Sequence, residues 1–447
     1  MTDEFKDKEG GLEAPTRHPV KWKEQEFLNE DNFFNEAERV FDVCHTCRRC
    51  VSLCESFPTL FDLVDESKTL EVDGVDKDDF DKVVDECYLC DLCYQTKCPY
   101  VPPHPWAIDF PHLMLRGKAI SYENKKKSVL KRMRDKVLTS TDTLGKSVKL
   151  PLLDITYKHF TNSKFLRNTT SGLTGIHPEA SLPKYEKGVL KYDPREDVKV
   201  QPAGKTTGKV AIFVGCYCRN NKPSIAEDLI KVLEHNEVAV KLIADEKCCG
   251  MPKLDLGDLK SVELLKEHNL PLLLDQIKEG YDIISLVPSC VLMFKQELPL
   301  LFSDNQDLLT IKEHIYDPFE YLSWRETEGV LRKDFKSSLG KIAYQVACHQ
   351  RVQNIGPKTR DVLEMIPKTK VETIERCSGH DGTYAVKKET HENSMKIVSP
   401  VVNKVDSSGA DHLTSDCPLA GEQIESASKE KTENAHPISL LRKAYKI

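Results

Sequence analysis

The chain has 447 residues, enough for roughly two to four domains with buried cores. Hydrophobic residues make up 39% of it and charged residues 30%, a composition too apolar for general disorder. A net charge of −7 argues against a nucleic-acid binder, and no apolar run is long enough for a membrane span. The charged N-terminus lacks the apolar core of a signal peptide, so we expect a cytoplasmic protein whose sixteen cysteines bind metal or do redox work.

The cysteines fall into three groups along the chain, which begin at Cys44, Cys216 and Cys348. Two long stretches, residues 1–43 and 99–215, contain none. This clustering predicts a metal domain, a connector and a C-terminal part made of two related halves. The boundaries that we expect are an N-terminal tail over 1–40, a ferredoxin-type domain over 41–115, a basic helical connector and linker over 116–205, and two C-terminal units over 206–335 and 336–447.

The first group contains two tight cysteine runs with the spacing of iron–sulfur proteins. The run from Cys44 reads C-x2-C-x2-C-x3-C, and the run from Cys87 reads C-x2-C-x2-C-x4-C-P. In proteins with two such runs, the fourth cysteine of each run binds the cluster of the other. We therefore predict two 4Fe–4S clusters, one on Cys44, Cys47, Cys50 and Cys98, and one on Cys87, Cys90, Cys93 and Cys54. A pair of zinc sites is the alternative, although zinc sites usually join two C-x2-C units across a longer gap.

The connector is strongly basic in an otherwise acidic protein. Residues 118–167 contain thirteen Lys or Arg and four Asp or Glu. Apolar residues recur at helical spacing over 129–138, with basic residues around them. Such a helix either packs its apolar stripe on its own domain, the favoured interpretation, or lies on an anionic membrane surface or an acidic partner. The stretch from Thr161 to Pro202 lacks periodicity and is predicted to be an extended linker.

The C-terminal half repeats one plan, in which predicted strands lead into cysteines and helical stretches separate the strands. The strands lie within residues 209–216, 238–245, 282–288, 341–348, 370–375 and 411–416. Matching junctions at matching intervals indicate a duplicated α/β unit. Cysteines at the ends of parallel strands would meet at the carboxyl edge of each sheet, where α/β folds bind ligands.

The second half of the chain resembles a known family. A cysteine, then Cys-Cys-Gly about 30 residues later, then another cysteine about 40 residues beyond is similar to the cysteine-rich CCG domain. The stretches RMRDKVLTSTDTLGK, VGCYCRNN, CCGMPK, GTYAVKKE and HPISLL also resemble this family. It includes the CCG-domain subunits of heterodisulfide reductase and of anaerobic glycerol-3-phosphate dehydrogenase, the iron–sulfur subunit of glycolate oxidase, and lactate-utilisation proteins. The chain matches best the domain order of the subunit from anaerobic glycerol-3-phosphate dehydrogenase.

The resemblance covers roughly residues 40–447 and implies a mixed α+β and α/β fold, with a helical two-cluster ferredoxin-type domain before a duplicated α/β CCG domain. It also implies an electron-transfer subunit that accepts electrons from a flavoprotein dehydrogenase and passes them to a membrane quinone or another acceptor, at the inner face of the cell membrane. The chain has no G-x-G-x-x-G motif after a strand, so we expect any flavin or nicotinamide to belong to the partner. Within the chain, we expect electrons to pass from the ferredoxin-type domain to the first CCG unit.

The chain departs from the fullest form of the family, in which five thiolates of a unit hold a noncubane 4Fe–4S cluster that reduces disulfides. Val287, Ser378 and Ala420 stand where that form has cysteine, and Cys218 is an additional thiol. The first unit keeps four thiols that could hold an iron–sulfur cluster or zinc, or hold no metal: Cys216, Cys248, Cys249 and Cys290.

The second unit is degenerate and keeps three thiols, Cys348, Cys377 and Cys417. With His380 they would form a Cys3His set suited to zinc, and an altered or empty site is favoured over a full cluster. The alternative for His380 is a loop histidine that contacts solvent.

Two alternative functions stay open. One is a thiol–disulfide reductase with Cys249 in the catalytic centre, against which the loss of a cysteine at Val287 counts. The other is a zinc-stabilised scaffold without redox activity.

Overall fold

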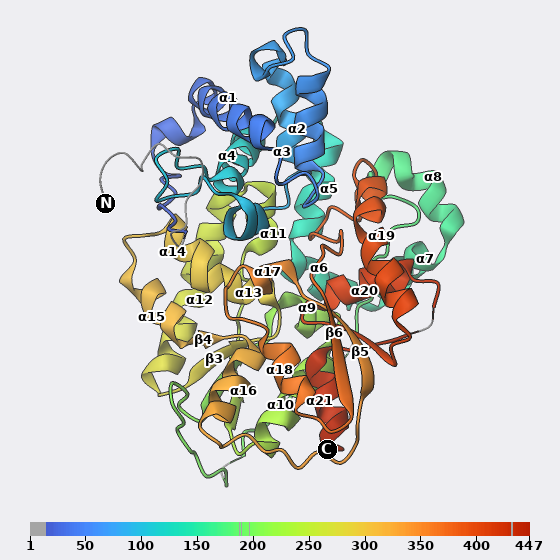
Figure 1. Ribbon diagram of the computed structural model, residues 1–447. Helices are drawn as coiled ribbons and strands as arrows, with labels where there is room; N and C mark the ends of the chain where they lie inside the picture. Colours follow the sequence, from blue (N-terminus) through green and yellow to red (C-terminus); the bar gives the residue numbers. More distant parts are fainter. Residues whose placement is uncertain (1–14, 187, 189, 196, 431) are drawn as a thin grey trace.

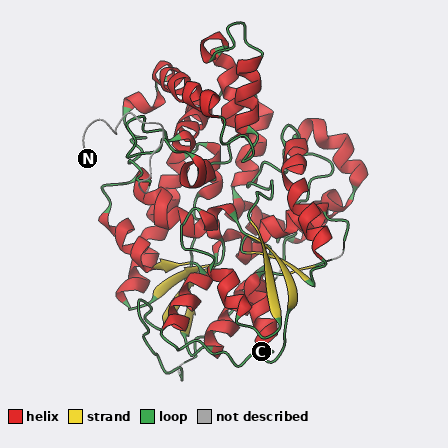
Figure 2. Cartoon of the chain, in the orientation of Figure 1, coloured by secondary structure: helices red, strands yellow, loops and turns green. Residues whose placement is uncertain are grey.

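The computed structural model describes residues 15–447 apart from 187, 189, 196 and 431 (Figure 1). The expectation for the charged N-terminus falls largely on residues 1–14, which lie outside the described residues. Helices dominate the described chain, and two small sheets lie in its C-terminal half (Figure 2). Within the described ranges, none of the helices has the length and apolar character needed to cross a membrane.

The N-terminal part is a small helical unit around a core of aromatic rings, at the top of Figure 1. Its helices are α1 (Glu30–Cys47), α2 (Ser56–Asp65), α3 (Phe80–Glu86) and α4 (Phe110–Glu123), with short 3-10 turns at Gln25–Leu28, Val72–Gly74 and Lys77–Asp79 and a π turn at Cys93–Lys97. The Phe57 and Phe110 rings stack with centroids 4.6 Å apart. Residue 40, the expected end of the tail, lies inside α1, because Asn29 caps this helix and Phe33 and Ala37 are buried in the core.

The connector is helical over most of its length. It forms α5 (Val129–Thr139), α6 (Thr141–Val148), α7 (Pro151–Asn162) and α8 (Lys164–Thr174). The prediction of an extended linker from Thr161 is therefore wrong for its first part. The side chain of Ser163 caps α8 by accepting a hydrogen bond from the Leu166 N–H, and Gly175, at φ 64°, ends the helix. Extended chain begins only beyond this glycine.

The C-terminal half contains two parallel four-stranded sheets with the same topology. The first is ordered β2 (Ala239–Leu242), β1 (Lys209–Phe213), β3 (Asp282–Ser285), β4 (Ile315–Tyr316). The second is ordered β6 (Thr369–Ile374), β5 (Gly340–Gln345), β7 (His412–Ser415), β8 (Glu433–Asn434). The central strands β1, β3, β5 and β7 are mostly buried, as expected for parallel sheets covered by helices. The duplicated α/β fold class is therefore confirmed.

Helices connect and cover the strands in each unit. The first unit contains α9 (Gly215–Asn220), α10 (Pro223–His235), α11 (Met251–Leu256), α12 (Leu259–Lys278), α13 (Pro288–Leu292), a π turn at Met293–Glu297, α14 (Leu298–Leu301), α15 (Gln306–His314) and α16 (Pro318–Thr327). The second contains α17 (Cys348–Arg351), α18 (Lys358–Glu364), α19 (His391–Ser408), α20 (Pro418–Ala427) and α21 (Pro437–Tyr445). The last helix packs on α10 of the first unit, where Arg442 forms an ion pair of 2.6 Å with Asp228. The two units therefore share one core.

A buried ion cluster ties the chain before α1 to the helical unit and to the first CCG unit. Arg17 contacts Asp109 at 2.9 Å, Asp91 at 3.0 Å and Glu297 at 3.7 Å. His112 lies 3.1 Å from Asp109 and 3.4 Å from Glu297. These groups come from segments far apart in sequence, so the cluster fixes how the cysteine runs lie against the first sheet.

Candidate iron–sulfur and thiol sites

The structure brings the first cysteine run together with Cys98. Cys44 and Cys47 lie in the last turn of α1, and the chain turns after it because Arg48 adopts φ 49°. Cys98 follows the π turn, where its N–H bonds to the Cys93 carbonyl at 2.8 Å. A hollow of about 300 Å³ is lined by four thiols, those of Cys44, Cys47, Cys50 and Cys98. Cys54, the last cysteine of the first run, does not line this hollow.

Cys54 lies instead with the second run. Burial raises the pKa of the Cys54 thiol well above its usual value, and the neighbouring Cys87 thiol raises it further. The pKa of Cys93 is raised in the same way, by burial and by its neighbours Cys50, Cys90, Cys87 and Cys54. Cys54 is thus a neighbour of a thiol of the second run, and Cys98 lies with those of the first; the exchange of cluster ligands itself stays a prediction.

The chemistry of both thiol sets fits an iron–sulfur cluster. Burial also raises the pKa of Cys44 well above its usual value, with Cys98, Cys50 and Cys47 as the next causes. Buried thiolates that repel one another need a positive charge among them, and metal binding supplies it while displacing the protons. Among the residues described, no three His, Cys, Asp or Glu side chains are grouped for one metal ion. A four-iron cluster binds each thiolate to a different iron and so requires a wider arrangement.

All seven candidate ligand cysteines of the two CCG units line one common cavity of about 870 Å³. Each lies just beyond a strand: Cys216 after β1, Cys248 and Cys249 after β2, Cys290 after β3, Cys348 after β5, Cys377 after β6 and Cys417 after β7. The carboxyl edges of the two sheets therefore face each other across the cavity. The sequence pattern predicted two separate sites, and the structure joins them.

The glycine of each Cys-x-Gly turn is required by the backbone. Gly250 has φ 103°, and α11 starts directly after it at Met251. Gly379 has φ 69°, and a Cβ there would collide with the Ser394 carbonyl oxygen. The connector also supports the first of these turns, because Asp142 of α6 accepts a hydrogen bond from the Cys248 N–H at 2.7 Å.

The four thiols of the first unit are in mutual contact. The Cys216 thiol donates to the Cys248 sulfur at 3.8 Å. The pKa of Cys248 is lowered well below its usual value, because Cys216 and Cys249 both donate hydrogen bonds to it. The pKa of Cys249 is raised by its hydrogen bonds with Cys248 and Cys290. This unit therefore holds one sulfur that is prepared to be a thiolate, the form that binds metal and attacks disulfides.

The second unit offers nitrogen donors beside its three thiols. His380 lines the cavity, and its Nε2 is buried with no hydrogen-bond partner among the described residues. Burial lowers the pKa of His380 to about 4, which keeps the imidazole neutral, as a metal ligand must be. A solvent-contacting loop histidine does not fit this buried nitrogen. His349 also lines the cavity, and its Nδ1 lies 2.7 Å from the Ser289 hydroxyl of the first unit.

The positions that have lost cysteine also face the cavity. Val287, Ser378 and Ala420 all line it. The extra thiol, Cys218, does not line it and is fully buried, with its pKa raised by burial and by Cys290 and Cys417. Cys218 is therefore packed behind the cavity wall.

The thiols of the two cysteine runs and of the cavity form one series of neighbours. Burial raises the pKa of Cys90 well above its usual value, and the thiols of Cys348, Cys54 and Cys377 raise it further. Cys417 and Cys290 are neighbours across the cavity. The second cysteine set thus adjoins the second CCG unit, whereas the sequence pattern predicted a path to the first. His349 and the contact between the sets were also missed, since only the strand-end pattern could have indicated that both sheets face one cavity.

Comparison with known proteins gives a family and several relatives. The cysteine-rich CCG domain matches residues 210–295 and 342–425. One subunit of anaerobic glycerol-3-phosphate dehydrogenase from Escherichia coli K12 is 30% identical over 315 residues, which are 70% of this chain and 77% of the relative. One subunit of a fumarate reductase (CoM/CoB) from Methanothermobacter marburgensis is 24% identical over 250 residues, 54% of this chain and 47% of the relative. An uncharacterized iron–sulfur protein of Methanocaldococcus jannaschii is 28% identical over 204 residues, 44% of this chain and 38% of the relative.

Proposed function

The chain belongs to the family of iron–sulfur proteins with the cysteine-rich CCG domain that includes this subunit of anaerobic glycerol-3-phosphate dehydrogenase, and we propose that it relays electrons as a subunit of an oxidoreductase. Its relatives include subunits of a dehydrogenase and of a reductase, which supports a redox role in general. The observation that carries the proposal is the unbroken series of neighbouring thiols from the first cysteine run to the CCG cavity. Closely spaced redox centres are what an electron relay requires.

Two cluster sites belong to the helical unit. Cys44, Cys47, Cys50 and Cys98 would hold one 4Fe–4S cluster, and Cys87, Cys90, Cys93 and Cys54 would hold the other. Such clusters supply one-electron oxidation and reduction. The contribution of the chain is to bury the thiols and to bring Cys50 of one set next to Cys93 of the other.

The common cavity would hold the last centre of the relay. Cys216, Cys248, Cys249 and Cys290 fit a third iron–sulfur cluster, since their sulfurs are in contact and one is prepared as a thiolate. The second unit, with three thiols and His380 on the cavity wall, is an altered site whose donor types suit zinc, but these side chains are not grouped around one ion in the described chain. The cavity is thus asymmetric although the fold around it is duplicated.

Metal and spectral analysis of anaerobically purified protein tests the proposal. The expected result is a brown protein with a broad visible absorption and about eight or more irons per chain, from two 4Fe–4S clusters and a third centre. A colourless protein with stoichiometric zinc would instead support a scaffold without redox activity and overturn the relay.

The proposed partner is a flavoprotein dehydrogenase or another reduced donor, and the proposed acceptor is a quinone. The lack of a dinucleotide-binding glycine motif in the sequence supports a separate donor. A purified complex containing bound flavin on a second polypeptide would support this assignment, and flavin bound to this chain alone would contradict it.

A second candidate function is reduction of a disulfide in the cavity. The lowered pKa of Cys248 beside Cys249 favours it, because a thiolate is the group that attacks a disulfide. Two electrons from the clusters and two protons from solvent would convert the disulfide into two thiols. Replacing Cys249 by Ser should abolish reduction of a mixed-disulfide substrate, and unchanged turnover would exclude this function.

The connector helices support a peripheral position on a membrane. The apolar stripe of α5 points to solvent, with 60% of Val129 and 61% of Met133 exposed. Helices α7 and α8, which follow in contact with one another, expose further apolar side chains, those of Leu150, Leu152, Leu153, Ile155, Phe165 and Leu173. Exposed lysines occur on α5, α6 and α8, at Lys136, Lys146 and Lys164. We assign this face to an anionic lipid surface, since lipid complements both its apolar area and its charge.

A further inference from the structure

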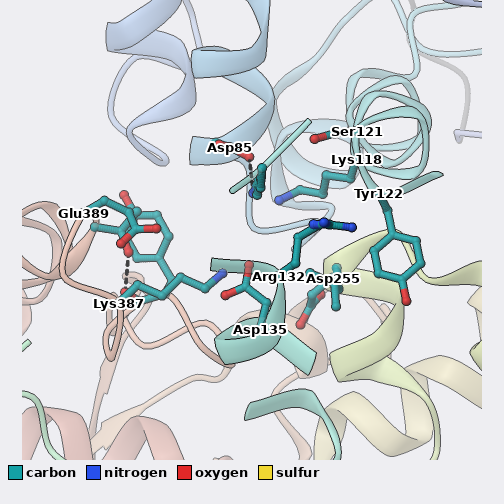
Figure 3. A pocket seen from close by; sticks show the side chains of 13 residues that line it. Asp85, Lys118, Ser121, Tyr122, Arg132, Asp135, Asp255, Lys387 and Glu389 are labelled. Atoms are coloured by element: carbon teal, nitrogen blue, oxygen red, sulfur yellow. Dashed lines mark hydrogen bonds and ion pairs between the residues drawn. The ribbon is translucent and has the colours of Figure 1, made fainter. Parts of the chain in front are cut away.

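A second pocket lies between the helical unit, the connector and the two CCG units, away from the hollow of the first cysteine set. It is lined by α4, α5, α11 and the segment before α19, and the centres of water-sized molecules have about 70 Å³ in it. Figure 3 shows Lys118, Arg132 and Lys387 converging on it from three of these elements, with Asp255 beside them. One water molecule needs roughly 10–15 Å³ on this measure, so the pocket has room for a small anion.

Three of the cations that line this pocket have no ion-pair partner among the described residues. Among the described residues, the ammonium groups of Lys118 and Lys387 form no hydrogen bond or ion pair within 4.0 Å. The guanidinium of Arg132 has no partner either, and its Nε is buried. Arg134, just outside the pocket, forms ion pairs with two of the carboxylates that line it, those of Asp135 at 2.8 Å and Glu389 at 2.8 Å.

The other ion pairs around the pocket leave these three cations unpaired. A fourth cation, Lys127, is bound to Asp85 at 2.8 Å. Three unpaired cations then face two buried carboxylates, that of Asp255 in the pocket and that of Asp381 beside it. Burial raises the pKa of Asp255 well above its usual value, with Asp381 as the next cause, so this group offsets the cations poorly.

Repulsion between the cations is visible at Lys387. Burial lowers the pKa of its ammonium group, and Lys127 and Lys118 lower it further, while Asp135 opposes them. Holding such groups together without a counter-charge is unfavourable, and a bound anion would relieve the repulsion.

We propose that this pocket binds a small organic anion through Lys118, Arg132 and Lys387. The ligand class is a carboxylate or a phosphate ester, since ammonium and guanidinium groups recognise the oxygens of both. The hydroxyl-bearing side chains of Ser121 and Thr390 line the same pocket and can hydrogen-bond the polar part of such a ligand.

The position of the pocket gives the anion a role in the relay, a consequence that rests on the proposed function. Lys118 is a charged neighbour of Cys87, a candidate ligand of the second cluster. An anion on Lys118 would reduce the positive field at this candidate cluster ligand and favour the oxidised, less negative cluster. Binding would therefore lower the midpoint potential of that centre, and its reduction would in turn weaken binding of the anion.

Calorimetric titration of the full chain with inorganic phosphate and with malonate tests the binding directly. Both titrations are made at one ionic strength, balanced with chloride. The expected result is one site per chain, with a dissociation constant that rises at least about tenfold in Lys387→Gln and in Arg132→Gln. Lys387→Arg, which keeps the charge, should bind within a few-fold of the wild type. Lys312→Gln, an exposed cation on α15, is the matched control and should bind unchanged.

Each outcome decides the proposal. Tighter binding of phosphate indicates a phosphate ester, and tighter binding of malonate a carboxylate. Absence of binding by both probes to the wild type, or equal binding by Lys387→Gln and the Lys312→Gln control, overturns the site. Binding without a change in the midpoint potential of any cluster contradicts only the role in the relay. A colourless protein that still binds the anion contradicts the proposed function and leaves the site intact.

Discussion

The side chains of Cys54 and Cys98 show how one residue decides which cluster a run supports. Cys54 follows Cys50 closely in the sequence yet lies with the second set, because the chain turns into α2 immediately after it. Cys98 is held back toward the first set by the π turn that follows Cys93. The backbone around the fourth cysteine of each run therefore decides which set of thiols that cysteine lies beside.

Replacing each fourth thiol in turn should remove one cluster at a time. Cys98→Ser and Cys54→Ser should each lose about four irons per chain, since a serine hydroxyl is a much poorer ligand to iron than a thiolate. Iron analysis of anaerobically purified variants measures this loss. Cys218→Ser is the control and should keep the wild-type iron content, because Cys218 lines neither the hollow nor the cavity. Full iron in Cys98→Ser would contradict the proposed ligand set.

At the scale of single elements, α5 is oriented opposite to an ordinary surface helix. Two of its charged side chains face the protein, where Arg134 is 8% exposed and Asp135 1% exposed. Its apolar residues face outward, so the interpretation in which the stripe packs on its own domain is wrong. On the inner side of the helix, Arg134 forms an ion pair of 2.8 Å with Glu389 of the second unit. Two lysines near its start form ion pairs with carboxylates of α3, Lys126 with Asp81 and Lys127 with Asp85. They are therefore not available to lipid.

Removing the exposed apolar side chains of α5 should weaken membrane binding. Replacing Leu130 and Met133 together by Ser should reduce binding to vesicles of phosphatidylcholine and phosphatidylglycerol by roughly tenfold or more, since each buried side chain contributes up to a few kcal/mol. Sedimentation with vesicles measures it, and added salt should weaken the wild type. Leu264→Ser, 71% exposed on α12, is the control. Equal binding by the double variant and this control would leave α5 without a role at the membrane.

Some elements could be predicted from the sequence for a physical reason, and others could not. The strands that end at Cys216 or Cys348 are continuous apolar runs beside a cysteine, and the structure has them where expected. The two-residue strands β4 and β8 have no sequence pattern, because they exist only as edges of a sheet already formed. Helix α8 was missed because its threonines and glycine weaken the periodicity, while its capping by Ser163 depends on a single residue.

The candidate sites also have features that the local sequence predicts and features that depend on tertiary packing. The grouping of Cys54 and Cys98 was accessible because the spacing of the runs is local information. That the two CCG units share one cavity was not accessible, because it depends on how α21 packs against α10. The pocket around Lys387 was also beyond the sequence, since its cations come from residues 118, 132 and 387 and no motif links them.

At the scale of the whole molecule, the buried ion cluster around Arg17 makes the docking of the parts depend on pH. The pKa of His112 is raised to about 9: burial and Arg17 lower it, but Asp109 and Glu297 raise it by more. The pKa of Glu297 falls to about 2: burial raises it, but hydrogen bonding from His112 and the charge of Arg17 lower it by more. A histidine whose pKa is raised in the folded state stabilises the fold fully below pH 6.5. This stabilisation is lost as the pH rises to about 9. A carboxyl group whose pKa is lowered in the folded state stabilises the fold fully above pH 4.5. This stabilisation is lost as the pH falls toward 2.

Stability should therefore decline on the alkaline side through His112. The free energy of unfolding should fall by about 2–3 kcal/mol between pH 6.5 and 9, and His112→Phe should be less stable at pH 6.5 but lack this decline. Anaerobic chemical unfolding followed by circular dichroism measures both. His159→Phe, at an exposed position on α7, should keep the wild-type profile. A decline of the same size in His112→Phe would assign it to other groups.

The relay itself predicts a magnetic interaction across the molecule. Cys50 belongs to the first cysteine set and is a neighbour of Cys93 in the second, so two reduced clusters on these sets would lie close together. Unpaired spins at close range interact, so dithionite-reduced protein should give a broadened electron paramagnetic resonance spectrum with features that neither cluster has alone. Cys54→Ser, which lacks the second cluster, should give one simple signal with the spin of a single cluster, whereas Cys218→Ser should keep the interaction. If the wild type shows only one isolated signal, or two that do not interact, the thiol sets do not carry adjacent clusters and the relay through Cys90 to the cavity fails with them.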